Sequence, residues 1–467
     1  MIVDDRGGVL QVAVIGASLA GLFAAAAVSR AGHQVTVLER DRLEDTAAAR
    51  PGVPQGAQPH VFLLRGLLAA EELLPGLRRD LQTLGAVPFD SARLAWLGEQ
   101  GWVPAEASGF EVISQSRPLL EQVVLRRVRE LDGVTLRDSC RVGGLHRNGS
   151  GSGRRWRVDA EEGDAVNADV VIDASGRGSR LPTWLASLGV PAATVTEVDA
   201  RIGYATREYR GDPDLGGLSG IVLQATADSP VGGLVLPVEN QRWLVLATGM
   251  GEHRPPRDVP GFEAHLRHLT DPSVADFADN CTPCGDVQVY RRTGNRRYHF
   301  ERQRDWPAGL LAIGDSFVSF NPVFAQGITV AAVEALVLRD ALTEGRLPDD
   351  ARRVMRRFAA VTALPWGIAT GQDLRQPTSS GRQTRAQAVM NAWARELSRL
   401  AAHGDARAME VLTRMYHLMG SPRSLLHPAL VGSALRARVR GYGPAAARPP
   451  ALAGLRGAHH RVDDGQR

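Results

Sequence analysis

The sequence predicts an α/β fold in which a parallel sheet is interrupted by a mainly antiparallel sheet and followed by a helical region. Three stretches support this prediction. Residues 9–40 have the pattern strand, glycine turn, helix, strand. Residues 199–249 have alternating apolar and polar positions separated by turns, and the part beyond residue 348 is rich in Arg and Ala at helical spacing. A chain of 467 residues is long enough for two or three domains.

Residues 9–40 are typical of a Rossmann-like dinucleotide site. Gly16 permits a tight turn, Gly21 lets helix and strand approach closely, and Ser18 stands at the middle position of G-x-G-x-x-G. A pyrophosphate would meet free N–H groups at the helix start, and the Glu39 carboxylate would accept hydrogen bonds from a ribose. The residues predicted to line this site are Gly16, Ser18, Leu19, Ala20, Gly21, Glu39 and Arg40.

The remaining elements follow in order along the chain. A loop at 46–59 precedes helices at 60–77 and 114–131, and Asn148 begins a Gly/Ser turn that continues to residue 153. A buried strand at 168–172 leads into DASGRGS. A hairpin turns near residues 239–241, GLLAIGDS forms a strand within 306–316, and residues 327–345 form a helix with a glycine stop.

These elements predict four regions. The discontinuous nucleotide-binding domain comprises residues 1–75, 111–190 and 291–345, and a substrate-binding β-sheet domain comprises 76–110 and 191–290. A C-terminal helical region covers 346–445, and the Pro/Ala/Gly-rich residues 446–467 are expected to be a disordered tail.

Composition excludes several classes of function. The formal charge is only +4, and all 55 basic residues are arginine, so neither a basic arm for nucleic acid nor a lysine Schiff base is expected. Three cysteines do not form a disulfide framework, no signal peptide is recognisable, and no apolar run reaches the roughly 20 residues of a membrane span. These features favour a soluble, cytoplasmic protein. No sequence feature specifies an oligomeric state.

Four motifs together resemble the FAD-dependent monooxygenases of the aromatic hydroxylase class, over residues 9 to about 345. They are GASLAG with Glu39, Arg117 in RPLLE, DASGRGS at 173–179, and GDSFVSFNPVFAQG at 314–327. Within that class, GVPQ at 52–55, LLPG at 73–76, NRR at 295–297 and FNPV at 320–323 resemble bacterial polyether epoxidases of the monensin and lasalocid type. The resemblance implies an FAD-binding fold of the glutathione-reductase type and noncovalent FAD.

The resemblance also implies roles for individual residues. Asp315 would bind the ribityl chain of FAD, and Arg117 would reach the same chain or the pyrophosphate. The positive end of the helix beginning at Gly327 and Ile328 would face the flavin ring. Catalytic residues are not identified, but a dry pocket beside the flavin would be lined by Phe317, Phe320, Pro322 and Phe324. Gln55 lies in the loop that the family folds over the flavin, although Gln55 and His60, as isolated polar residues, are surface groups by default.

Departures from the family pattern favour one reaction. The histidine that is usual after Gly-Asp is replaced by the apolar Phe317 and Val318, and Phe324 replaces a glycine, so no convincing base adjoins this loop. Aromatic hydroxylation often needs a base, whereas an alkene attacks a flavin C4a-hydroperoxide directly. The expected reaction is therefore insertion of one oxygen from O2 into a bulky apolar polyketide or terpenoid, as an olefin epoxidation. Ser175 replaces an Asp that helps handle NAD(P)H in the family, which argues against direct reduction by NAD(P)H. The expected electron source is NAD(P)H, directly or through a separate flavin reductase.

Alternatives remain open at the level of sequence. A phenolic polyketide hydroxylase would require Tyr204 or Tyr209 to face the flavin as a base. An oxygen-independent reductase of the geranylgeranyl-reductase type, or a non-enzymatic FAD-binding protein, would use the same cofactor; a flavin halogenase is disfavoured because the chain lacks lysine. Cys281 and Cys284 with His265 and His268 imitate a zinc site, but the histidine spacing is tight, and reduced thiols without metal are expected.

Overall fold

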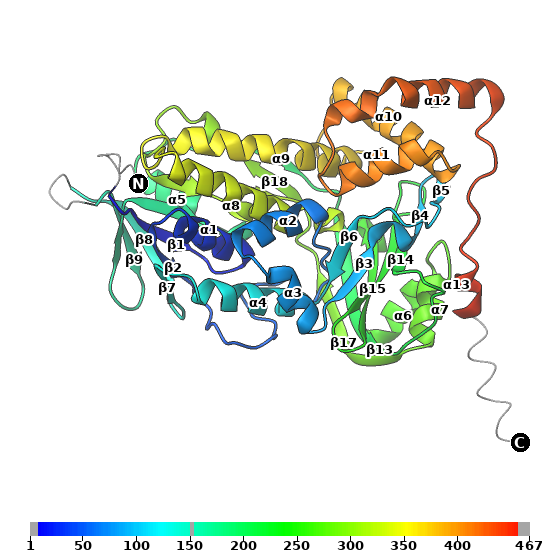
Figure 1. The fold of residues 1–467 in the computed structure, drawn as a ribbon, viewed down its shortest axis with the longest axis horizontal. Helices are drawn as coiled ribbons and strands as arrows, with labels where there is room; N and C mark the ends of the chain where they lie inside the picture. Colours follow the sequence, from blue (N-terminus) through cyan, green and yellow to red (C-terminus); the bar gives the residue numbers. More distant parts are fainter. Residues whose placement is uncertain (1–7, 150–153, 456–467) are drawn as a thin grey trace, which may run out of the picture.

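The computed structural model describes residues 8–149 and 154–455 and has an elongated body with the nucleotide-type fold at one end and a large antiparallel sheet at the other (Figure 1). The parallel sheet has the order β19-β11-β1-β2-β7. Every neighbouring pair in it runs parallel. Its strands are β1 (Gln11–Ile15), β2 (Gln34–Leu38), β7 (Val134–Arg137), β11 (Val170–Asp173) and β19 (Leu310–Ala312).

Helices complete this Rossmann-like layer. The small alanines from 24 to 27 are fully buried and let α1 pack closely between the sheet and α8. The helices and short strands of this part are α1 (Leu19–Arg30), α2 (Leu64–Leu73), α3 (Leu77–Thr83), α4 (Arg117–Arg129), α5 (Leu181–Ser187) and α8 (Gly327–Thr343), with β8 (Val142–Arg147), β9 (Trp156–Ala160) and β10 (Val166–Ala168). The predicted α/β fold is confirmed. Part of the predicted Gly/Ser turn, residues 150–153, lies outside the described residues.

The large sheet is the predicted antiparallel insertion. Its order is β17-β13-β16-β15-β14-β4-β5, and only β14 and β4 pair in parallel within the described residues. The predicted hairpin joins β15 to β16 through residues 239–241. The strands are β4 (Leu94–Gly98), β5 (Gly101–Trp102), β13 (Ile202–Arg210), β14 (Gly220–Leu223), β15 (Val231–Val238), β16 (Arg242–Met250) and β17 (Thr282–Tyr290).

Alternation along these strands gives the large sheet two different faces. Ala205, Val235 and Val245 belong to the core packed against α6 (Val259–Arg267) and α7 (Ser273–Asp279). Tyr204 and Leu246 point to the opposite face, in a separate apolar cluster. The hydroxyl of Tyr204 reaches Asn321, so this second face meets the nucleotide-type part of the molecule. We call it the inner face.

Short elements connect the two parts. One small antiparallel sheet has the order β12-β18-β20, and another pairs β3 with β6. Their bounds are β12 (Val195–Val198), β18 (Asn295–Tyr298), β20 (Val318–Ser319), β3 (Val87–Asp90) and β6 (Glu111–Ser114). Short 3-10 turns are η1 (Ser91–Arg93), η2 (Gly176–Gly178), η3 (Gly251–His253), η4 (Phe300–Arg302), η5 (Gly314–Ser316), η6 (Pro322–Phe324) and η7 (Pro422–Leu426).

The C-terminal region is helical, as predicted. In Figure 1 its first long helix runs along the top of the nucleotide-type part, and its other long helices lie at the upper right of the molecule. The region contains α9 (Ala351–Asp373), α10 (Arg385–Ala402), α11 (Ala406–Tyr416) and α12 (Pro428–Arg440). Helix α9 packs on α8 and so joins this region to the nucleotide-type part. No helix within residues 8–149 and 154–455 is long and apolar enough to cross a bilayer.

The expectation of a disordered tail from residue 446 is wrong for residues 446–455. Ala446 forms a bridge to Trp102, Arg448 pairs with Asp271 at 2.8 Å, and α13 (Ala451–Gly454) follows. Leu452 and the next leucine, at 455, are buried in the outer core of the large sheet. Two leucines three residues apart are enough to anchor one helical turn, even in a segment whose Pro, Ala and Gly content is typical of disorder.

Candidate functional site

The turn between β1 and α1 is closed by glycines at both ends. Gly16 has φ of 102°, and a Cβ added there would lie 2.7 Å from the carbonyl oxygen of Ala174. A Cβ on Gly21 would lie 1.8 Å from the carbonyl oxygen of Gly16. Neither position tolerates a side chain, because backbone atoms already occupy the space that the Cβ would need. The spacing of these two glycines is therefore explained by the packing of the turn.

Ser18 leaves the start of α1 open. It makes no side-chain cap to its own helix within the described residues. Its hydroxyl donates to Glu121 at 2.7 Å and accepts from Arg117 at 2.9 Å. The first-turn N–H groups of α1 therefore keep the positive end of the helix available for an anion.

Glu39 lies beside this turn. Its carboxylate accepts from the N–H of Ala17 at 2.6 Å and from that of Asp41 at 3.0 Å, and Arg50 lies 3.3 Å away. The neighbouring Arg40 has an exposed side chain whose Nε lies 3.9 Å from Asp41. The structure thus brings Glu39 to the glycine turn and leaves Arg40 at its margin.

Two charged residues that the sequence analysis missed complete this cluster. Glu121 pairs with Arg117 at 2.9 Å and with Arg50 at 3.0 Å, and Arg50 also donates to the carbonyl of Ala17 at 2.7 Å. Burial would raise the pKa of Glu121, but the two guanidinium groups outweigh burial and lower it. The i,i+4 spacing of Arg117 and Glu121 in RPLLE is a sequence signal for this pair. Arg50, in a loop, offers no comparable signal.

The DASGRGS turn packs against the glycine turn and is closed by its own serines. The fully buried Asp173 accepts hydrogen bonds from the backbone N–H of Ser175 at 3.0 Å and from the hydroxyls of Ser175 and Ser179. Burial raises the pKa of Asp173, and the serine donors partly oppose this. Ser175 therefore acts here as a donor within the turn.

Arg177 connects that turn to the late GDS motif. Its Nε lies 3.5 Å from Asp315, and its other nitrogens donate to the carbonyls of Gly294 and Phe320. Burial raises the pKa of Asp315, with Arg177 as the nearest opposing charge. The sequence indicated the DASGRGS motif that contains Arg177 but gave no signal for Arg177 itself.

Glu334 supports the same motif from α8. Its buried carboxylate accepts from the N–H of Gly314 at 2.8 Å. Burial, with some repulsion from Asp315, raises the pKa of Glu334 to about 8. A protonated Glu334 avoids placing a second negative charge behind Asp315.

A buried polar network holds the loop that follows β20, residues 320–326. Tyr204 donates to Asn321 Oδ1 at 2.8 Å, and Asn321 Nδ2 donates to Asp373 at 2.9 Å. Asn295 donates to Asp373 at 2.6 Å and accepts from the N–H of Asn321 at 2.7 Å. The network therefore joins the large sheet, the loop, β18 and the end of α9.

Burial dominates the ionisation of this network. It raises the pKa of Asp373 to about 7, with a smaller contribution from Asp199, while the amides of Asn321 and Asn295 oppose the shift. It also raises the pKa of Tyr204 well above the ordinary value. Tyr204 is thus a fixed hydrogen-bond donor over the usual pH range.

The predicted flavin-side residues differ in their surroundings. Phe317, predicted to line the pocket beside the flavin, packs in the core with ring centroids 6.4 Å from both Phe300 and Phe358. Phe320 is also buried, whereas Pro322 and Phe324 are half-buried. Core packing thus accounts fully for the burial of Phe317.

The start of α8 lies directly after this loop. Gly327 begins the helix and Ile328 is buried in the core. The preceding residue, Gln326, makes no side-chain cap, and its buried Oε1 has no hydrogen-bond partner in the described part of the chain. A buried, unsatisfied acceptor beside an open helix N-terminus is expected where a ligand completes the hydrogen bonding.

The loop at 46–59 is tied to the large sheet through two of its glutamines. Gln55 donates to the hydroxyl of Tyr290 at 2.9 Å, and Gln58 accepts from Thr206 at 2.6 Å. His60 bonds through Nδ1 to the carbonyl of Gln58 at 2.8 Å, and burial lowers its pKa to about 3. Gln55 and His60 are half-buried, so the expectation that they are surface groups is not met. The partner of Gln55 lies 235 residues away along the chain, where no local sequence pattern indicates it.

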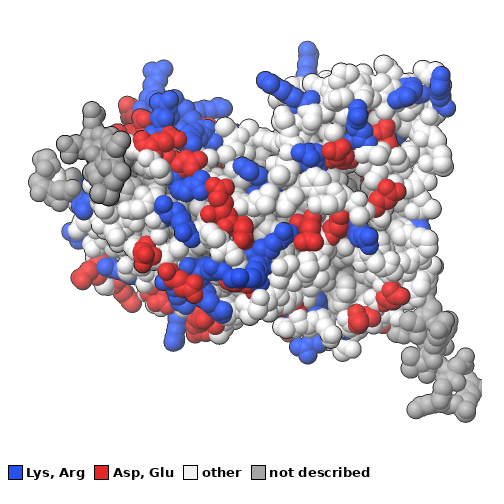
Figure 2. Space-filling view, viewed as in Figure 1, with Lys and Arg blue, Asp and Glu red and all other residues white. Residues whose placement is uncertain are grey.

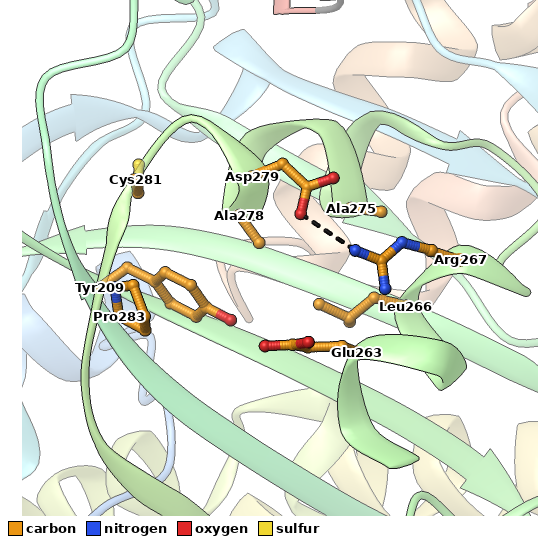
Figure 3. A pocket seen from close by; sticks show the side chains of 9 residues that line it. All are labelled: Tyr209, Glu263, Leu266, Arg267, Ala275, Ala278, Asp279, Cys281 and Pro283. Atoms are coloured by element: carbon orange, nitrogen blue, oxygen red, sulfur yellow. Dashed lines mark hydrogen bonds and ion pairs between the residues drawn. The ribbon is translucent and has the colours of Figure 1, made fainter. Parts of the chain in front are cut away.

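Tyr209 lies on the other face of the large sheet, in a pocket of about 190 Å³ between α6, α7 and β17 (Figure 3). Arg267 and Asp279 face each other across it at 3.4 Å. Burial raises the pKa of Cys281 to about 11, and Cys281 and Cys284 are free thiols. Among the described residues, no group of three or more His, Cys, Asp or Glu could hold a metal ion. The pocket is lined by Tyr209, Glu263, Leu266, Arg267, Ala275, Ala278, Asp279, Cys281 and Pro283.

Comparisons with known proteins agree with this geometry. The family model described as FAD binding domain matches residues 9–345, and the chain belongs to this family of FAD-binding monooxygenases. Protein Rv3254 of Mycobacterium tuberculosis is 32% identical over 371 residues, which cover 75% of this chain and 77% of that protein. The 6-methylpretetramide 4-monooxygenase of Streptomyces rimosus is 25% identical, covering 86% of this chain and 89% of the relative.

More distant similarities extend the comparison. Squalene epoxidase 2, mitochondrial, of Arabidopsis thaliana is 25% identical, covering 85% of this chain and 62% of the relative. The crystal structure of pqsL, a probable FAD-dependent monooxygenase from Pseudomonas aeruginosa, matches with a TM-score of 0.60 at 16% identity, covering 79% of this chain and 98% of that chain. This last likeness confirms the fold.

The residues present fit the cofactor of the family, which is FAD. The open N-terminus of α1 and the arginines 50 and 117 suit a pyrophosphate, and the carboxylates at 39 and 315 suit hydroxyl groups. The unsatisfied amide oxygen of Gln326 lies at the opposite end of the same region, at the start of α8. The chemistry of both helix N-termini and of the glycine turn thus suits a dinucleotide.

Proposed function

We propose that this monooxygenase inserts one oxygen atom from O2 into a bulky apolar polyketide or terpenoid, as an olefin epoxidase. The observation that carries the proposal is that, among the described residues, the side chains that could serve as a base near the loop at 320–326 are unsuited to that role. The carboxyl of Asp373, with a pKa of about 7, is already held by the amides of Asn321 and Asn295. Tyr204 already donates a hydrogen bond to Asn321, and its pKa is well above the ordinary value. Tyr209 belongs to the face covered by α6 and α7. His60, with a pKa of about 3, would not retain a phenol proton.

Epoxidation needs an alkene that is positioned against the flavin in a pocket that excludes water, and it does not need a base. The inner face carries Leu234 and Leu246, and the neighbouring Phe320 is buried, so an apolar molecule between them would exclude water. Bound FAD supplies the activated oxygen. The chain's part is to orient the alkene against the ring and to keep water away, and the Asn321 network fixes the loop that would carry this contact.

We assign the cofactor contacts by chemistry. The start of α1 and Arg117 would bind the pyrophosphate, Glu39 a ribose, and Asp315 the ribityl chain. Gly327 and Ile328 would bring the positive end of α8 to the flavin ring, which stabilises negative charge on the ring. Gln55, bonded to Tyr290, would hold the 46–59 loop beside the same region.

The second candidate is hydroxylation of a phenolic polyketide. It is favoured by the similarity to 6-methylpretetramide 4-monooxygenase, whereas the similarity to squalene epoxidase 2 favours epoxidation. Both relatives are 25% identical to this chain, so identity does not separate them. The lack of a tyrosine or histidine suited to act as the base favours epoxidation, and the motifs at 52–55 and 320–323 that resemble polyether epoxidases support the same proposal.

The test is a product assay on the FAD-loaded protein. Polyenes and phenolic polyketides of similar size are offered with NADPH, with and without a flavin reductase. A product heavier by one oxygen that has lost an alkene supports the proposal, whereas a new phenol supports the alternative. Fast anaerobic bleaching of the flavin by NADPH alone would show that Ser175 is compatible with direct reduction, and bleaching only with the reductase would establish a separate electron donor.

A further inference from the structure

Helix α12 is apolar on two opposite sides. Leu430, Ala434 and Ala437 are buried in the small core of the C-terminal helices. On the outward side, Val431, Leu435 and Val439 are 40%, 59% and 85% exposed. Their spacing of four residues places them along one line of the helix surface. Leu426, just before α12, adds a further side chain that is 62% exposed.

Arginines border this line. Arg436 and Arg440 are exposed on one side, and Arg438, on the other, lies 3.6 Å from Glu396. The sequence contains no Asp or Glu between Glu410 and Asp463. In Figure 2 the upper right corner, where Figure 1 draws α12, carries blue side chains and uncharged surface. The outward side of α12 is therefore an apolar strip with a cationic rim.

An apolar strip with an arginine rim is the pattern of a helix that lies in a bilayer interface. The apolar side chains enter the boundary of the acyl chains while guanidinium groups remain at the level of anionic headgroups. Pairing with a second copy fits less well. It would bring two cationic rims together, and the segment from 411 to 462 offers no carboxylate to pair with them.

We propose that the outward side of α12, formed by Leu426, Val431, Leu435 and Val439 with Arg436 and Arg440, docks on an anionic phospholipid surface. Because α12 lies at the edge of the molecule and packs on α10, contact there leaves the nucleotide-type part unobstructed (Figure 1). The inference concerns a surface away from the oxygenation site and does not depend on the proposed reaction.

The test is sedimentation of the full-length, FAD-loaded protein with lipid vesicles. Binding is expected to phosphatidylcholine vesicles that contain phosphatidylglycerol, and not to phosphatidylcholine alone. Raising the salt from about 0.05 M to about 0.5 M should release the protein, because screening weakens the headgroup contacts. The double variant Leu435→Ser, Val439→Ser should bind about tenfold more weakly, which corresponds to loss of part of the apolar burial of two side chains.

Matched variants separate the possible outcomes. Leu68→Ser, at a leucine 45% exposed on α2, should bind vesicles like the unchanged protein. Arg436→Gln with Arg440→Gln should reduce binding without altering the apolar strip, and flavin absorbance reports folding in every case. Equal binding by the serine double variant, or no preference for anionic lipid, would overturn the proposal. So would light scattering that shows a dimer lost in that variant, because the strip would then bind a second copy.

Discussion

Replacing Asp373 with Asn should remove a pH-dependent loss of stability. Burial raises the pKa of this carboxyl from 3.8 to about 7. Each pKa unit is worth about 1.4 kcal/mol, so the ionised form is disfavoured by about 4 kcal/mol in the folded protein. Because the folded pKa is the higher one, the folded state binds the proton more tightly. The stabilisation is complete below about pH 4 and is lost as the pH rises through about 7.

The measurement is the free energy of unfolding in urea at pH 5, 6, 7 and 8, with saturating FAD. The original protein should lose about 2 to 3 kcal/mol more than Asp373→Asn between pH 5 and pH 8. Glu334, with its pKa of about 8, titrates in both proteins and cancels in the difference. Asp349→Asn, at a carboxylate 79% exposed, should follow the original profile. Parallel profiles for the original protein and Asp373→Asn would refute the assignment of a buried, proton-binding Asp373.

Three further substitutions test other parts of the account. Glu39→Ala should raise the FAD dissociation constant, measured by flavin fluorescence, by tenfold or more, because a charged hydrogen-bond acceptor is lost. Glu44→Ala, at an exposed carboxylate, should leave the constant unchanged. Equal FAD affinities of the two variants would count against the ribose contact. Tyr204→Phe should lower the free energy of unfolding by about 1 kcal/mol and retain oxygenation, because the hydroxyl donates to Asn321 and is not a base; loss of product formation would favour the hydroxylase alternative. Leu452→Ala should lower the free energy of unfolding by about 2 to 4 kcal/mol, and Leu426→Ala, at an exposed leucine, should lower it by less than about 0.5 kcal/mol. Similar values for both variants would mean that α13 is not anchored.

Local patterns predicted much of the fold. The β1–α1–β2 unit, the hairpin at 239–241 and the helix beginning at Gly327 each carry their signal within one element, as periodicity or as a turn residue. The glycines at 16 and 21 were predictable for the same reason, since their steric requirement arises within the turn itself and against the strand beside it. The segment at 446–455 departed from its local pattern, because its structure comes from packing on a distant sheet.

The residues that the sequence did not reveal act across long separations. Asp373 lies at the end of a helix 52 residues from Asn321, and Arg50 reaches Glu121 over 71 residues. No spacing rule connects such positions, because each contact depends on how the two sheets and α9 meet. The separation of Tyr204 and Tyr209 onto opposite faces was accessible from strand alternation once the register was known, but the choice of inner face required the structure.

The most direct test of the central claim is oxygen labelling. The FAD-loaded protein, reduced and then mixed with a bulky apolar polyene under ¹⁸O₂, should yield a product that carries one ¹⁸O atom and one alkene fewer. Incorporation of oxygen from water, or oxidation of the reduced flavin with no labelled product from any polyene or phenol offered, would contradict the account.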